Sequence, residues 1–317
     1  MADIYDTTVT HMKIGVAVPI VNPSFKFWDD PNTWSVPNGW TKANLTVGRY
    51  WTGYDGDQAS LKLSAAGIPD DYSYKIQSTP CRFWYDYHVL NTAQDFYWSL
   101  AGQATISGGG ANVGAAIQLR TADTVGMTGS LTSSTLKSFT TTSAAELVRF
   151  TGTANHNPSA GNEFADILMF LRDATVIFVY WDCIGVMFNP IDASGYYQLT
   201  NVFPANGPQF WYEKMGQLIK TPLGTHKRHD PSGGAEKIKL SLQFINEDIT
   251  TYETLKYFHQ LNWGTPGLPG LPLALEPNLP GLPPMLIVNW MDNDFPLTRD
   301  TTKAERYSGT CNFETMW

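Results

Sequence analysis

Carboxylate pairs are the residues of this chain whose types and spacing could do hydrolytic chemistry. They occur at four places: Asp29-Asp30, Asp70-Asp71, Glu247-Asp248, and Asp292 with Asp294. A glycosidase needs two carboxyl groups held about 5–10 Å apart across a sugar cleft, whereas adjacent acidic residues in turns are usually solvated. The chain also lacks a serine-nucleophile elbow and a paired His and Asp context. The pattern therefore favours a protein without catalytic residues over a hydrolase.

Two further segments could hold an ion. Gly224–Gly234 contains His226 and His229, but two histidines do not complete a metal site, so an exposed hairpin tip is favoured. Ser107–Asn112 is rich in glycine, yet no Lys-Ser/Thr follows to complete a phosphate-binding loop, which favours a hairpin loop. The three cysteines, Cys81, Cys183 and Cys311, show no metal-ligand spacing and predict free thiols in a chain folded in a cytosolic compartment.

Aromatic side chains are the strongest candidates for a binding surface. Aromatic residues make up 13% of the chain, and eleven of them are Trp. Arg82–His88 and Phe96–Trp98 place rings on both faces of their predicted strands, and ring faces stack on pyranose sugars. The candidate carbohydrate-binding residues are Trp84, Tyr85, Tyr97 and Trp98. The alternative, that these rings pack a core or a subunit interface, stays open.

Size and composition predict a two-domain globular protein. The chain has 317 residues, with 43% hydrophobic and 16% charged side chains. A net charge of −8 argues against a general nucleic-acid surface, and we predict no sequence-specific nucleic-acid partner. The most apolar stretch, Ile167–Val186, contains Arg172, Asp173 and Asp182, so we predict no membrane span. The N-terminus shows no secretory signal pattern.

Alternating apolar residues predict an antiparallel β-sandwich over residues 13–192, preceded by an arm over 1–12. Met12–Ile20 alternates strictly, and short strand candidates separated by Gly, Ser, Thr and Asn recur afterwards. They are Ala59–Ser64, Tyr72–Ser78, Arg82–Leu90, Phe96–Ala104, Val113–Arg120, Leu147–Thr153, Phe164–Leu171 and Val176–Val186. No helical period competes in this region.

The sequence pattern of residues 193–317 predicts a smaller β-barrel-like domain with one helix. Lys237–Phe244 alternates as a strand, and a helix over about 250–262 begins with Thr250 and Glu253 as a capping box. The Pro/Gly-rich segment 264–284 predicts a polyproline-type surface loop rather than collagen, because three Gly triplets are too few for a triple helix. The final strand candidates are Met285–Trp290, Phe295–Asp300 and Ala304–Glu314.

The first domain resembles the jelly-roll carbohydrate-binding modules. The resemblance rests on Asn22–Phe25 with Trp28, Pro37–Trp40, Gly56–Leu63 and Val179–Val186. It implies a glycan-binding sandwich and, in many such modules, a structural calcium. Here Lys26 stands where an acidic residue is usual, although Asn22 and Asp182 could still supply oxygens to calcium. No other cofactor is expected.

The second domain resembles the tail-tube-like barrel of phage tail and baseplate proteins. The residues that carry this are Tyr212–Lys220, Leu223–Thr225, Lys237–Phe244, Thr251–Phe258 and Tyr307–Glu314. The resemblance implies a non-enzymatic virion protein that is folded in the host cytoplasm and assembles with itself in a ring. Its expected partners are other tail or baseplate proteins and a host-surface glycan. The alternative is a carbohydrate-binding module protein without a tail role.

Overall fold

The chain divides into two compact units. The computed structural model describes residues 12–316 except 29–34, 51–52, 55–59, 85–92, 109–113, 144–145, 200–208, 215–216, 221–225, 230–235, 265, 267–268, 278–282 and 302–304. The sandwich unit comprises Lys13–Gln198 and Ala274–Leu286, and the second unit comprises Met1–Met12, Leu199–Leu273 and Ile287–Trp317. Segment 274–286, which we predicted in the barrel-like domain, is thus assigned to the sandwich unit. The predicted arm lies outside the described residues except for Met12.

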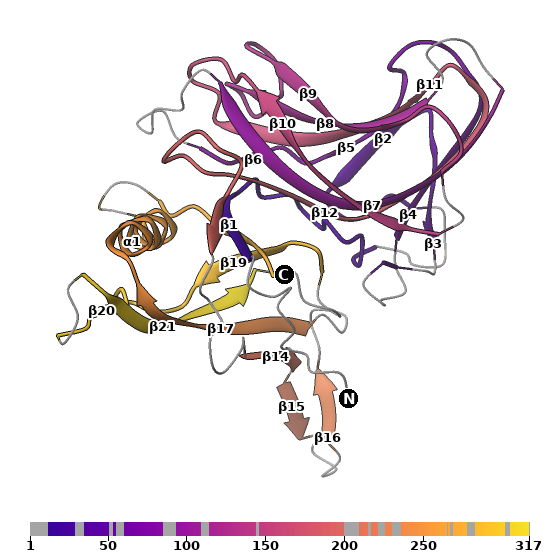
Figure 1. Ribbon diagram of the computed structural model, residues 1–317. Coiled ribbons are helices and arrows are strands. Elements are labelled where there is room, and N and C mark those ends of the chain that lie inside the picture. Colours follow the sequence, from indigo (N-terminus) through magenta and orange to yellow (C-terminus); the bar gives the residue numbers. More distant parts are fainter. Residues whose placement is uncertain are drawn as a thin grey trace. The chain divides into compact units, whose positions relative to one another are not determined.

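The sandwich unit is an antiparallel jelly-roll of two curved sheets (Figure 1). Sheet I runs in the order β10 (Val148–His156), β7 (Gln94–Ser107), β12 (Ala174–Phe188), β4 (Ser60–Ile68) and β3 (Thr46–Tyr50), and β1 (Met12–Ala17) also pairs with β12. Sheet II runs in the order β2 (Trp40–Ala43), β5 (Tyr74–Ser78), β11 (Phe164–Arg172), β8 (Gly114–Ala122) and β9 (Thr132–Phe139), with β6 (Cys81–Arg82) beside β11. Successive strands such as β7 and β8, or β11 and β12, cross between the sheets, which confirms the predicted sandwich. Two short strands, β13 (Tyr197–Leu199) and β18 (Leu273–Glu276), complete the set.

The core of this unit lies between the two sheets. Ile177, Val179 and Trp181 of β12 are fully buried, while Phe178 between them is exposed, as a two-residue period requires. The Trp181 ring stacks on Phe139 of sheet II at a centroid distance of 5.2 Å. Alternation along β12 therefore separates a core face from an outer face.

A β-bulge in β12 reverses that alternation. The pairing of β12 with β7 shifts register between Asp182 and Gly185, and Cys183 there has a φ of 50°. Beyond the bulge Phe188 faces the core, where its ring lies 5.0 Å from that of Phe96. One continuous strand thus uses odd-numbered residues for the core before the bulge and even-numbered ones after it.

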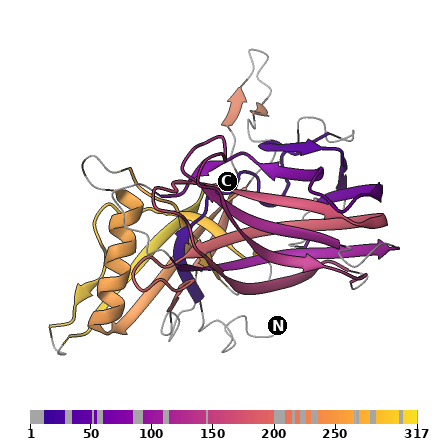
Figure 2. The same cartoon turned by 90° about the horizontal axis from the view of Figure 1, so that it is seen from above.

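The second unit is a small sheet with one helix. Its strands are β14 (Gln209–Lys214), β17 (Glu236–Glu247), β21 (Tyr307–Thr315) and β19 (Leu286–Trp290) in that order, with β20 (Thr298–Arg299) beside β21 and a hairpin of β15 (Gln217–Lys220) and β16 (His226–His229). Helix α1 (Ile249–Trp263) lies beside β17 and β21 in both views (Figures 1 and 2). Tyr252 stacks on Tyr307 at 4.0 Å, so the helix packs on the sheet through aromatic contacts. In the described part of the chain, no helix is long and apolar enough to cross a membrane.

Three local expectations were wrong in detail. The helix is capped by Asp248, which accepts the Thr251 N–H at 2.8 Å, and not by Thr250, which already lies within the first turn. Strand β18 interrupts the predicted loop 264–284, because Leu273–Glu276 is a buried segment. His226 and His229 lie on strand β16 instead of at a loop tip. The Leu223–Thr225 turn lies outside the described residues.

Candidate functional site

The described rings that we predicted to bind sugar are buried. Trp84, Tyr97 and Trp98 are exposed by 3, 5 and 7%, and Tyr85 lies outside the described residues. Trp84 contacts Phe188 in the core, with ring centroids 5.3 Å apart. A ring face covered by protein cannot stack on a sugar. In the structure these three rings pack against other residues, which is the alternative that the sequence left open.

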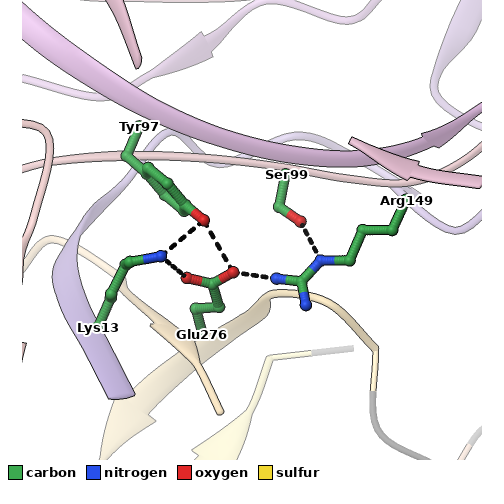
Figure 3. Close-up of polar contacts among 5 residues, drawn as sticks. All are labelled: Lys13, Tyr97, Ser99, Arg149 and Glu276. Atoms are coloured by element: carbon green, nitrogen blue, oxygen red, sulfur yellow. Dashed lines mark hydrogen bonds and ion pairs between the residues drawn. The ribbon is translucent and has the colours of Figure 1, made fainter. Parts of the chain in front are cut away.

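Tyr97 belongs instead to a polar cluster around Glu276, the Glu276 cluster, formed with Lys13, Ser99 and Arg149 (Figure 3). The Tyr97 hydroxyl donates to Glu276 Oε1 at 2.8 Å, and Lys13 Nζ donates to Tyr97 Oη at 2.8 Å and to Glu276 Oε2 at 2.6 Å. Arg149 donates to Glu276 Oε1 and, through Nε, to Ser99 Oγ at 3.1 Å. The carboxylate is therefore enclosed by three donors from three different strands.

The electrostatics of the Glu276 cluster indicate an anchor. Burial lowers the pKa of Lys13, but its hydrogen bonds to Glu276 and Tyr97 outweigh that effect and raise the pKa above its usual value. Burial raises the pKa of Tyr97, which keeps the hydroxyl a neutral donor. Glu276 comes from β18, so the cluster ties this returning segment to β1, β7 and β10. Sequence reasoning missed it because Lys13 and Glu276 are separated by 263 residues.

A row of polar side chains crosses the outer face of sheet II, and we call it the amide row. The register places Thr41 opposite Gln77, Gln77 opposite Leu168, Leu168 opposite Gln118, and Gln118 opposite Thr135. Their chain neighbours on the opposite face, Ile76, Ile117 and Ile167 among them, are fully buried in the core. Gln118 Nε2 donates to Thr135 Oγ1 at 3.2 Å. The row therefore spans five strands on the face turned away from the core, with polar members on four of them and the buried, apolar Leu168 at its centre on β11.

A buried ion pair lies directly beside the amide row. Arg120 and Asp166 are cross-strand partners, and Arg120 donates from Nε to Asp166 Oδ1 at 2.8 Å and from Nη2 to Oδ2. Arg120 Nη2 also donates to Gln77 Oε1 at 3.3 Å, which fixes the orientation of that amide. Burial raises the pKa of Asp166, and the bonds from Arg120 oppose this. The two charges neutralise each other, leaving hydrogen-bonding groups in fixed positions.

An apolar floor and an exposed ring adjoin the amide row. Ala116, Leu168 and Phe170 form a buried apolar cluster beneath the side chains of this face, with exposures of 5–8%. The Tyr72 ring is 50% exposed and packs edge-on against Phe170, with centroids 4.7 Å apart. An accessible ring supported from below, next to amides that both donate and accept, suits recognition of a hydroxyl-rich ring.

The predicted calcium ligands are engaged in other bonds. Asn22 Oδ1 accepts the Phe27 N–H at 3.2 Å, while its amide donates to Phe27 O at 2.8 Å. Both carboxylate oxygens of Asp182 accept backbone N–H groups, from Tyr54 and Cys183, at 2.8 Å. Calcium requires six to eight oxygen ligands, and no group of three or more His, Cys, Asp or Glu suited to a metal occurs among the described residues. This donor set fits calcium poorly, and calcium binding stays a prediction.

Several of the other candidate residues from the sequence have structural partners. Asp29-Asp30 and most of the Ser107–Asn112 loop lie outside the described residues. Asp70 pairs with Arg172 at 3.3 Å, Asp71 accepts from Ser73, and Asp292 accepts from Trp290 and Asn312. Cys183 and Cys311 are buried free thiols, and Cys81 is a partly exposed one. Asp70, Asp71, Asp248 and Asp292 thus take part in an ion pair, a turn, a helix cap and side-chain hydrogen bonds.

His156 forms a second buried polar network within the sandwich. Its Nε2 lies 2.7 Å from Thr121 Oγ1 and its Nδ1 lies 3.0 Å from Ser134 Oγ, while Asn162 donates to the same Thr121 at 3.0 Å. Burial lowers the pKa of His156 to about 4. The imidazole is therefore neutral in the folded protein and joins β8, β9 and β10.

The stability of the sandwich should consequently fall in acid. The unfolded chain binds a proton at His156 near pH 6.5 and the folded protein only near pH 4, so the His156 contribution is complete above pH 6.5 and is lost as the pH falls towards 4. That gap corresponds to roughly 3 kcal/mol. Urea unfolding between pH 4 and 7 measures it, and His156→Gln should flatten this part of the profile. Equal pH profiles for the two proteins would contradict the assignment.

The chain is similar to known proteins in structure but not detectably in sequence. No protein-family model and no curated protein sequence matches the chain. The CBM22-1–GH10 modules of the Clostridium thermocellum xylanase 10B are 11% identical, with a TM-score of 0.35 over 55% of this chain and 28% of theirs. A putative sugar binding protein from Bacteroides thetaiotaomicron is 9% identical, with a TM-score of 0.35 over 54% of this chain and 99% of its own.

A third solved structure, the CBM22-1 xylan-binding domain from Paenibacillus barcinonensis, is 14% identical, with a TM-score of 0.33 over 55% of this chain and 95% of its own. All three similarities cover about half of this chain. At TM-scores of this size, no function is inferred from them.

Proposed function

We propose that the sandwich unit binds a glycan chain on the outer face of sheet II. The observation that carries this is the amide row, with the neutralised Arg120–Asp166 pair and the exposed Tyr72 ring beside it. Amides and hydroxyls can exchange hydrogen bonds with sugar hydroxyls, and the Tyr72 ring offers a stacking face. We further propose that the protein is a non-enzymatic binding protein, in which the described carboxylates serve structure.

Binding to soluble polysaccharides tests this function. Affinity gel electrophoresis and titration calorimetry on xylan, mixed-linkage β-glucan and galactomannan should find at least one ligand for the full chain. Tyr72→Ala removes the stacking ring and should lower affinity about tenfold, which equals about 1.4 kcal/mol. Gln118→Ala removes one or two hydrogen bonds, each contributing about 0.5–1.5 kcal/mol, and should lower affinity about three- to tenfold.

Val125→Ala is the matched control for these two variants. Val125 is an exposed apolar residue in the turn after β8, outside the amide row, so its truncation should leave affinity unchanged. The proposal fails if the full chain binds none of the three polysaccharides. It also fails if Tyr72→Ala and Gln118→Ala bind as tightly as the control.

A second candidate function is assembly in a phage tail or baseplate, with the chain located in the virion. The observation that favours it is in the second unit: among the described strands, β14 pairs only with β17, so it is an edge strand that can accept another chain. Edge-to-edge pairing of identical subunits closes rings. Mass spectrometry of purified virions tests this role, because a ring subunit must be present in several copies per particle. Absence from the particles would exclude it.

A further inference from the structure

The outer face of sheet I carries exposed aromatic residues of its own. Tyr50 of β3 and Phe178 and Tyr180 of β12 form what we call the aromatic strip. Tyr50 and Phe178 are each 37% exposed, and the rings of Tyr50 and Tyr180 lie 4.5 Å apart. Phe178 and Tyr180 alternate with the fully buried Ile177, Val179 and Trp181, so the strip faces away from the core. Exposed rings gathered on one face are a departure from the normal scatter of single apolar residues on a surface.

Polar side chains surround the aromatic strip, and one of them contacts its rings. Lys62 of β4 is the cross-strand partner of Tyr180, and its Nζ lies 5.2 Å from the Phe178 centroid and 5.9 Å from that of Tyr180. Such cation–π contacts restrain ring orientation. On the other side, Gln103 of β7 lies opposite Tyr180, and the exposed Thr105 lies opposite Phe178. Amide and hydroxyl groups therefore flank the rings on the same sheet.

We infer that the aromatic strip is a second saccharide-binding surface, on which sugar rings stack on Phe178, Tyr180 and Tyr50. This inference rests on the proposed function and adds a second binding surface to it. The inner faces of sheets I and II pack together, so the strip and the amide row lie on opposite sides of the sandwich. The two surfaces recognise sugars in different ways. The amide row relies on directed hydrogen bonds across strands, and the strip relies on ring stacking.

The size of the strip favours a saccharide over a protein partner. An aromatic side chain presents about 200 Å², so an exposure of 37% leaves roughly 75 Å² accessible on Tyr50 and on Phe178. A stable protein–protein interface buries about 800 Å² on each partner. The exposed ring area thus matches one or two sugar rings, and a protein partner would have to draw most of its contact area from residues around the strip. Its members and the flanking Lys62, Gln103 and Thr105 carry no carboxylate, so neutral or acidic sugars both fit.

Stoichiometry with a short oligosaccharide tests the inference. Calorimetry of the full chain with xylohexaose, cellohexaose and mannohexaose should give two sites for the hexasaccharide that binds. The double variant Phe178→Ala/Tyr180→Ala should retain one site, and adding Tyr72→Ala should remove the remaining one. Val148→Ala, an exposed apolar residue of β10 in the same sheet, is the control and should keep both sites.

The outcomes separate this inference from the proposed function. If Phe178→Ala/Tyr180→Ala keeps two sites, or if the full chain has one site that Tyr72→Ala removes, the aromatic strip binds no sugar and the amide row stands. If the double variant removes all binding while Tyr72→Ala has no effect, the strip stands and the amide row fails. The inference would also be overturned if the double variant bound sugar like the unaltered chain but had a different sedimentation coefficient. The strip would then be a contact between copies of the chain.

Discussion

Replacing Glu276 by glutamine is expected to lower the free energy of unfolding of the sandwich unit by about 3 kcal/mol. The variant keeps the shape of the side chain but leaves Lys13 and Arg149 without their counter-charge. Breaking a buried ion pair from one side costs about 3–5 kcal/mol. The lower end applies here, because the side chains of Lys13 and Arg149 retain exposures of 20 and 23%. Urea unfolding of the full chain, followed by tryptophan fluorescence, measures the loss.

Glu163→Gln is the matched control for this prediction. Glu163 pairs with Arg82 at 2.7 Å, but the Arg82 side chain is 46% exposed, and exposed ion pairs contribute about 0–1 kcal/mol. Because the chain has two units, the unfolding curve is fitted with two transitions, and only the one assigned to the sandwich should move. Equal losses in the two variants would show that Glu276 is not an anchor.

Truncating Trp181 to alanine should have the largest effect of any single core change, about 3–5 kcal/mol. The Trp181 ring is fully buried and stacks on Phe139 between the two sheets. Gly102 lies directly against it, since a Cβ at Gly102 would come within 2.8 Å of the ring. A smaller residue at 181 therefore leaves a cavity that the rigid strand pairing on both sides cannot close. Thermal and urea unfolding of the variant measure the cost.

Two companion variants make this prediction specific. Trp181→Phe should lose less than Trp181→Ala, because phenylalanine keeps the stack with Phe139 and removes the buried Nε1–H, for which the described residues supply no acceptor. Phe178→Ala changes an exposed ring on the same strand and should cost within about 1 kcal/mol. If Trp181→Ala were no worse than Phe178→Ala, the placement of the core between the sheets would be wrong.

Strand periodicity predicted most of the fold, because alternation is a local property of the chain. Lys237–Phe244 and Val176–Val186 fall within β17 and β12. Strand β9 was missed because its sequence, Thr132–Phe139, is mostly Ser and Thr, which are equally typical of loops. The bulge at Cys183 was also missed, since the sequence shows no glycine there to indicate the positive φ.

The candidate sites were harder to predict, because they depend on register and on which face is buried. Gln77 and Gln118 stand 41 positions apart, and they share the amide row only because each lies opposite Leu168. The sequence identified Phe96–Trp98 as a segment with rings on both faces. It could not show that Trp98 faces the core while Tyr97, on the other face, is covered by the Glu276 cluster.

Because the sandwich unit takes its last segment from residues 274–286, it is discontinuous in the sequence. During synthesis the ribosome must therefore translate all of 199–273 before β18 can join the sheet and deliver the Glu276 carboxylate. Until then Lys13 and Arg149 lack the carboxylate that both contact in the folded structure. A fragment that ends at Gln198 would lack β18 and the Glu276 carboxylate. The sandwich unit can therefore be completed only after most of the second unit has been translated.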